Sequence, residues 1–300
     1  RKDGERNPNN FKEHKRVLRE FCVTVTTLTA AYRLTNDERF ANQAIKHIQA
    51  WFVNSATSMN PSLLYAQAIK GISTGRGIGI IDTVRLIDVA VSILFLEEKK
   101  ILKDESLAIV KKWFNDYSDW LTTHPYGIDE RDHNNNHSTW WGAQVAAYAQ
   151  VAGRDDILKV CQVQFKNQLD IQMAEDGSFP KELSRTKPFH YVNYNLRAWS
   201  AFALLASTSS ENLWKYQSKN GTLQKAVDYV IPFYNSPITW NNSTELEKEI
   251  HPQRNDFLLF SYWGLGKNEY LELWKNLGKS KNKIGAGDEN LVLWENKITG

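Results

Sequence analysis

The stretch AAYRLTND, at residues 30–37, has a counterpart in AAYAQVAGRD, at residues 146–155. In both stretches an apolar helical pattern ends in a short polar turn, and a second amphipathic pattern begins directly after it. Helix pairs that recur in this way stack side by side and bury the faces they share. A series of such pairs forms an α/α toroid or barrel when it curls on itself, and a superhelical scaffold when it does not. The repeat therefore predicts an all-α chain built from antiparallel helix pairs, and we favour the (α/α) toroid.

The rest of the chain follows the same helical periodicity. Between residues 11 and 33, apolar side chains such as Leu18, Phe21 and Val25 recur at the spacing of one helix face. Asn36 and Asp37 precede a second pattern of this kind, as helix-capping residues do. Further helices are predicted over residues 82–96, 104–121, 138–151, 155–173, 194–207, 223–234, 255–265 and 269–277. Because no break in composition interrupts the series, we predict one catalytic domain over residues 1–300.

Composition excludes several classes of protein. The chain has 300 residues, of which 42% are hydrophobic, so it can bury a substantial core. Its formal net charge of +3 does not indicate a nucleic-acid partner, but it is compatible with a local basic groove for a polyanion. The sequence contains no apolar run of the length that spans a membrane. Cys22 and Cys161 lie far apart in apolar helical patterns, and we predict that both are buried free thiols.

Chemically useful side chains gather around two segments that lack helical periodicity, residues 60–79 and 173–193. Long irregular segments in a helical chain usually carry function. The stretch NNNHSTWW begins at Asn134, and DGSFP, ELSR and HY follow at residues 176–180, 182–185 and 190–191. Together they supply an amide, an imidazole, a guanidinium and a phenol. This set can stabilise a carboxylate, remove a proton next to it and protonate a leaving oxygen.

Four motifs follow one another along the chain: MNPSLLYAQ at 59–67, GRGIGIID at 75–82, NNHSTWW at 135–141, and the segment from DGSFP to Tyr191. In this order they resemble the alginate lyase superfamily of helical polysaccharide lyases, and most closely the branch of glucuronan and mannuronan lyases. The resemblance implies an (α/α) barrel. It also implies β-elimination on a 4-linked uronic-acid polymer, namely alginate, polymannuronate or glucuronan, which leaves 4,5-unsaturated uronate ends.

The resemblance also assigns the catalytic residues. The Asn-His pair of the family falls on Asn136 and His137, and its arginine and tyrosine fall on Arg185 and Tyr191. An amide and a guanidinium can neutralise the uronate carboxylate while the C5 proton is removed. Tyr191 is the predicted acid for O4, and it can also be the base for mannuronate or glucuronate, where both groups leave from one face. For guluronate, where they leave from opposite faces, His137 is the predicted base.

Residues near these motifs are predicted to bind the polymer: Tyr65, Gln67, Arg76, Asn135, Trp140 and His190. The first three are equally compatible with bracing their own loop. Of Trp140 and Trp141, we expect one in the core and one in the groove. No metal or other cofactor is predicted, because His133 and His137 lack the glutamate of a helical zinc motif. The expected partner is the anionic polysaccharide alone, bound by a monomer that is secreted or periplasmic, with its signal segment outside this chain.

Two other functions fit parts of the pattern. An inverting glycoside hydrolase on the same helical barrel needs two carboxylates across a cleft, roughly 6.5–9.5 Å apart. Its candidates are Asp129, Glu130, Asp176, Glu182 and Glu249. The run from Asp129 to Asp132 is otherwise expected to be a solvated turn near the cleft. A non-catalytic polysaccharide-binding protein would use the aromatic residues without needing Tyr191. Ultraviolet absorbance separates the three functions, because only a lyase makes an unsaturated uronate.

Overall fold

The computed structural model describes residue 3, residues 12–278 and residues 288–297. Within these residues there are three isolated β-bridges but no strand. The α-helices are α1 (Glu13–Thr35), α2 (Glu38–Ile48), α3 (Leu86–Glu98), α4 (Asp104–Thr123), α5 (Pro125–Arg131), α6 (Asn136–Ala152), α7 (Asp155–Gln172), α8 (Pro180–Leu183), α9 (Pro188–Ala206), α10 (Leu223–Asn235), α11 (Asp256–Leu265) and α12 (Asn268–Asn276). A π-helical turn, η1 (Gln49–Val53), extends α2, and the 3-10 segments are η2 (Gly77–Thr83), η3 (Leu213–Lys215), η4 (Pro237–Thr239) and η5 (Asp288–Lys297).

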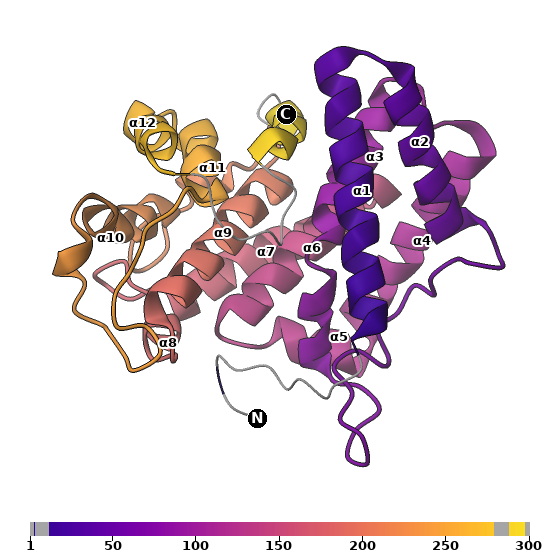
Figure 1. Ribbon diagram of the computed structural model, residues 1–300. Helices are drawn as coiled ribbons and strands as arrows, with labels where there is room; N and C mark the ends of the chain where they lie inside the picture. Colours follow the sequence, from indigo (N-terminus) through magenta and orange to yellow (C-terminus); the bar gives the residue numbers. More distant parts are fainter. Residues whose placement is uncertain (1–2, 4–11, 279–287, 298–300) are drawn as a thin grey trace.

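The helices follow one another from one side of the molecule to the other. Figure 1 shows α1 on the right, α6 and α9 in the middle, and α10 and α12 on the left, which is the course of an α/α toroid. Helix α6 is buried along most of its length because α3, α4, α7 and α9 pack around it. The approach of α6 to α9 is close: a Cβ added to Gly142 would lie 2.2 Å from Cε1 of Phe202. The predicted all-α toroid is therefore confirmed.

The repeated stretch ends its two helices by one mechanism. The residues after α1 and α6, Asn36 (φ 56°) and Gly153 (φ 71°), both adopt the left-handed conformation that closes many helices. After the first of these turns, the carboxylate of Asp37 accepts a hydrogen bond from the backbone N–H of Arg39 and so begins α2. In both places the next helix folds back on the previous one, so that α1 packs on α2 and α6 on α7.

Two helices at the site begin earlier than predicted. Helix α6 begins at Asn136 rather than at residue 138, and α9 begins at Pro188 rather than at residue 194. Proline suits the first helical position, because an N–H there has no partner within the helix. His190 and Tyr191 therefore lie on the first turn of a helix and not in an irregular segment. The sequence pattern does not predict α5.

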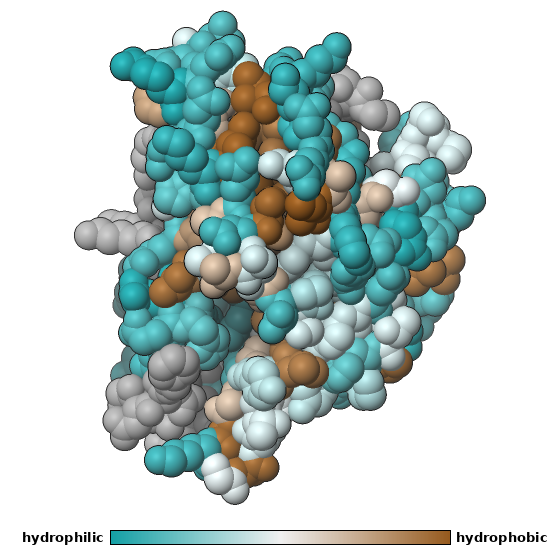
Figure 2. All heavy atoms as spheres, turned by 90° about the vertical axis from the view of Figure 1, so that its right-hand side faces the viewer, coloured by the Kyte–Doolittle hydropathy of each residue, from teal (hydrophilic) through white to brown (hydrophobic). Residues whose placement is uncertain are grey.

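The buried residues form one hydrophobic cluster that reaches from Leu18 in α1 to Trp294 in η5. Cys22 and Cys161 are buried free thiols, as predicted. The face shown in Figure 2 is mostly hydrophilic, with a band of apolar residues in its upper part and smaller, separate apolar patches elsewhere. Among the described helices, none combines the length and the apolar character that crossing a membrane requires.

Candidate active site

Asn136 and His137 are the first two residues of α6, and Asn135 caps that helix. The side-chain Oδ1 of Asn135 accepts a hydrogen bond from the backbone N–H of His137 (3.1 Å). Asparagine is a favoured N-cap because its side chain satisfies one of the N–H groups that a helix leaves unpaired. The side-chain oxygen of Asn135, a predicted polymer ligand, thus caps the helix that carries the Asn-His pair.

Glu182 on α8 holds Asn136. Its carboxylate is 0% exposed and accepts three hydrogen bonds from Asn136: one from the backbone N–H (2.6 Å) and two from Nδ2 (2.8 and 2.9 Å). Burial raises the pKa of Glu182, and the hydrogen bonds from Asn136 oppose that rise. The amide of Asn136, predicted to contact the substrate carboxylate, donates to this protein carboxylate.

Arg185 connects this carboxylate to Tyr191. The Arg185 guanidinium lies 3.6 Å from the centre of the Tyr191 ring, and its Nη1 is 3.7 Å from Oε2 of Glu182. Its other edge holds Asp3 through a two-pronged contact, from Nε to Oδ2 (2.9 Å) and from Nη2 to Oδ1 (2.6 Å). The backbone N–H and hydroxyl of Thr186 also donate to Asp3. Hydrogen bonding to Arg185 holds the pKa of Asp3 well below its usual value. The arginine fork is thus able to bind a carboxylate beside the phenol ring.

His137 contacts a second buried carboxylate. Its Nδ1 is 2.8 Å from Oε1 of Glu130, whose side chain is 0% exposed, and the imidazole itself is 12% exposed. The prediction of a solvated turn is therefore wrong at Glu130, because α5 packs against α4, α6 and η2. The His133 ring lies 5.3 Å from the ring of His137. No group of three or more potential metal ligands occurs in the described part of the chain.

Aromatic rings continue the site along α9. The His190 ring stacks on Tyr194 with its centre 6.2 Å away, and Tyr194 lies 5.1 Å from Trp140. Trp140 and Trp141 are 2% and 0% exposed, so the expectation that one of them lines a groove is wrong. The prediction of Trp140 as a polymer ligand loses its basis for the same reason. Tyr194 follows Tyr191 by three positions, and residues three apart lie on the same face of a helix. A prediction that begins the helix at Pro188 would therefore place Tyr194 beside Tyr191 at the site.

The segment between η1 and η2 supplies the remaining predicted ligands. Arg76 donates from Nε to the backbone oxygen of Gln67 (3.0 Å) and from Nη2 to its Oε1 (3.3 Å), and Gln67 donates to Asp82 (3.3 Å). Gln67 and Arg76 thus brace the loop, which is one of the two roles the sequence allowed. Tyr65 is 72% exposed and its ring is open to a ligand.

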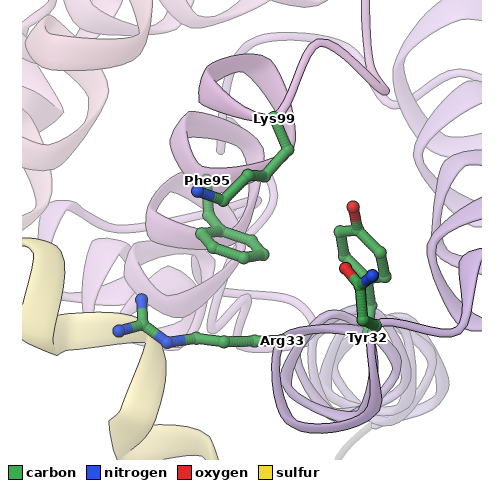
Figure 3. A pocket seen from close by; sticks show the side chains of 5 residues that line it. Tyr32, Arg33, Phe95 and Lys99 are labelled. Atoms are coloured by element: carbon green, nitrogen blue, oxygen red, sulfur yellow. The ribbon is translucent and has the colours of Figure 1, made fainter.

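The buried Glu182 connects three of the four predicted catalytic residues, and the fourth, His137, follows Asn136 directly in the chain. Glu182 links Asn136 on α6 to Arg185, which stacks on Tyr191 at the start of α9, while Glu130 holds the neighbouring His137. A separate cavity of about 270 Å³ lies near the C-terminal ends of α1 and α3. There Arg33 and Lys99 approach Phe95, with Tyr32 opposite (Figure 3), and none of the predicted site residues lines it.

Comparison with known proteins gives one family. The family model described as alginate lyase matches residues 1–240. The crystal structure of an alginate lyase from Bacteroides ovatus has 27% sequence identity and a TM-score of 0.84, with 98% of this chain and 78% of that chain covered. Alginate lyase A1-III from Sphingomonas species A1 has 18% identity and a TM-score of 0.70, with 97% and 80% covered. A search of curated protein sequences finds no match.

The second fold relative has also been solved with a sugar bound. A histidine-to-alanine variant of alginate lyase A1-III, complexed with tetrasaccharide, has 17% identity to this chain and a TM-score of 0.71. The superposition covers 97% of this chain and 83% of the relative. At this level of identity the likeness establishes the fold.

Proposed function

The chain belongs to the alginate lyase family, and from that membership we propose that it cleaves alginate by β-elimination at a 4-linked uronate. The finer proposal is a preference for polymers of mannuronate or glucuronate, in which H5 and O4 leave from the same face. One observation carries the proposed reaction: the arginine fork of Arg185 holds the carboxylate of Asp3 while its face lies on the ring of Tyr191. A carboxylate site directly beside a phenol is what this reaction requires.

In the proposed mechanism a uronate carboxylate takes the place of Asp3. It then meets the same two donors, which lie 2.9 and 2.6 Å from the Asp3 oxygens. These charged hydrogen bonds strengthen as the C5 proton leaves and negative charge moves onto the carboxylate. A donor of this kind is worth roughly 3 kcal/mol in a transition state.

Proton transfer falls to Tyr191 and His137. The guanidinium of Arg185, 3.6 Å from the Tyr191 ring, places positive charge beside a phenolate that can remove the C5 proton and return it to O4. For guluronate, His137 removes the proton from the opposite face, and Tyr191 protonates O4. Because Glu182 occupies the amide of Asn136, we assign the substrate carboxylate to Arg185 and give Asn136 the role of holding Glu182.

The hydrolase alternative has less support. Glu130 and Glu182 are both 0% exposed, and each is engaged with a residue at the start of α6. Neither is presented across an open cleft, as an inverting hydrolase needs. We propose that the protein acts as a monomer. Because a polymeric substrate stays outside the cytoplasm unless it is transported, we also infer a secreted or periplasmic protein.

The test is to incubate the protein with mannuronan, guluronan, glucuronan and mixed alginate, with and without a chelator. We expect ultraviolet-absorbing product from at least one polymer in both conditions. New reducing ends without ultraviolet absorbance would favour the hydrolase. Activity that a chelator abolishes and calcium restores would contradict a mechanism built on side chains alone.

A variant of Asp3 tests the observation that carries the proposal. Asp3→Asn removes the charge that competes for Arg185, so the KM for the cleaved polymer should fall while the rate at saturation changes little. A raised KM in a protein with unchanged thermal melting would remove the arginine fork from substrate binding.

A further inference from the structure

Glu130 is a buried carboxylate whose hydrogen-bond partner is the imidazole of His137. Its Oε1 lies 2.8 Å from Nδ1, while its Oε2 is buried without a partner among the residues the structure describes. A carboxylate that is 0% exposed is costly to keep in a protein interior unless a partner compensates for the lost hydration. Because this burial is costly, the contact does little for stability, and this points to a role in function.

The element that carries Glu130 is held firmly. Helix α5 begins at Pro125, with the ring Nδ1 of His124 accepting from the backbone N–H of Tyr126. It packs so closely on its neighbours that a Cβ added to Gly127 would lie 2.1 Å from the backbone oxygen of Leu121. A carboxylate on a packed helix can fix the orientation of a ring more tightly than one on a loop.

The contact also selects one form of the ring. An ionised carboxylate can only accept a hydrogen bond, so beside it Nδ1 carries the proton, and in the neutral ring Nε2 then carries the lone pair. Nε2 of His137 has no hydrogen-bond partner among the described residues, and unlike Nε2 of His133 it is not sealed from solvent. The lone pair is therefore available to a substrate atom.

We propose that Glu130 is the positioning residue of this site: it fixes the Nδ1-protonated tautomer of His137 and turns the basic Nε2 toward the substrate. The proposal rests on the proposed lyase function, in which only the anti elimination of guluronate needs a base separate from Tyr191. Glu130 should therefore matter more for guluronan than for mannuronan. In a serine protease triad, the change of the orienting aspartate to asparagine costs about 10⁴-fold in kcat because the wrong tautomer forms.

The test compares Glu130→Gln with wild type and with a control, Asp132→Asn. Glutamine matches glutamate in shape, but its amide can donate to Nδ1 and so favour the opposite tautomer. Asp132 is an exposed carboxylate two positions away, paired with Arg131 at the surface. Nitrogen-15 NMR of the His137 imidazole reports the tautomer, and thermal melting reports the fold.

We expect Nδ1–H in wild type and in Asp132→Asn, and Nε2–H or a mixture in Glu130→Gln. We also expect kcat on guluronan to fall about 10²–10⁴-fold in Glu130→Gln, with a much smaller loss on mannuronan and little change in KM. An Nε2–H ring in wild type, or an unchanged tautomer in Glu130→Gln, would overturn the proposal. So would equal losses on the two polymers. The tautomer is measured without substrate, so it decides the assignment even if the protein cleaves none of the four polymers and the proposed function fails.

Discussion

Replacing Asn136 with aspartate tests the buried link between α6 and α8. In the native protein, Nδ2 of Asn136 lies 2.8 and 2.9 Å from the two carboxylate oxygens of Glu182, which is 0% exposed. Asn136→Asp keeps the size of the side chain but replaces the donor with a second carboxylate. Two negative charges then face each other in the protein interior.

The cost can be worked out in two ways that agree. Two unit charges about 4 Å apart repel by about 4 kcal/mol at the effective dielectric constant of 20 that suits protein sites. If one carboxyl instead takes up a proton, holding a group of ordinary pKa near 4 in its protonated form at pH 7 also costs about 4 kcal/mol. We therefore expect the free energy of unfolding at pH 7 to fall by about 4 kcal/mol. Proton uptake by the native state implies a recovery of about 1.4 kcal/mol for each unit that the pH is lowered toward 5.

Urea denaturation at pH 5, 6 and 7 measures this loss and its pH dependence. The control is Asn134→Asp, which makes the same chemical change at an exposed position two residues earlier. It should lower the free energy of unfolding by less than about 0.5 kcal/mol at every pH. The reasoning is refuted if Asn136→Asp costs less than about 1 kcal/mol at pH 7, or if its loss does not shrink as the pH falls.

Three further predictions concern the phenol, the buried glutamate and the core. Tyr191→Phe should lower the rate of ultraviolet-absorbing product at least about 10²-fold with little change in thermal melting; a folded variant with more than about a tenth of the rate would remove Tyr191 from the acid role. Burial raises the pKa of Glu182 in the native state above its value in the unfolded state, so between these two pKa values the native state binds more protons. The stability that this proton binding contributes is lost as the pH rises from the lower pKa to the higher one. Glu182→Gln should therefore flatten the pH dependence of the free energy of unfolding above pH 4.5, by at most about 1.4 kcal/mol per pH unit, whereas Glu175→Gln at an exposed position should leave it unchanged. Gly142→Ala places a methyl group 2.2 Å from the Phe202 ring, so calorimetry should show a loss of about 1–3 kcal/mol; an unchanged melting temperature would mean that α6 and α9 separate freely.

Local sequence predicted most of the helices but not all of their ends. Apolar side chains at a spacing of three or four residues identify a helix wherever one face is buried, which holds for α1, α4 and α7. The apolar pattern places the start of α9 too late because the first turn of this helix lacks the pattern, although Pro188 is a signal for a first helical position. The backbone N–H groups of Phe189 and His190 in that turn donate to the carboxylate of Glu247. Glu247 lies 58 residues after Phe189 in the chain, so no local sequence pattern reveals this contact.

Burial was the property that sequence predicted least well at the site. Glu130 stands in a run of charged residues that is typical of a solvated turn, yet its side chain is 0% exposed. Trp140, on α6, is 2% exposed because Tyr194 and Arg197 of α9 pack beside it. Whether a polar residue faces water or a neighbour depends on which helices meet, and the residues beside it in the chain do not decide that.

The sequence by itself determined the helical pairs and their order, because helical periodicity is a property of neighbouring residues, and its motifs predicted Asn136, His137, Arg185 and Tyr191 as the catalytic set. Only the tertiary structure decided what each of these side chains touches. Glu182 reaches Asn136 across 46 residues, and Asp3 reaches Arg185 across 182. Contacts over such separations form when the toroid brings the ends of α5, α6, α8 and α9 together, since the energy that fixes them comes from packing between helices.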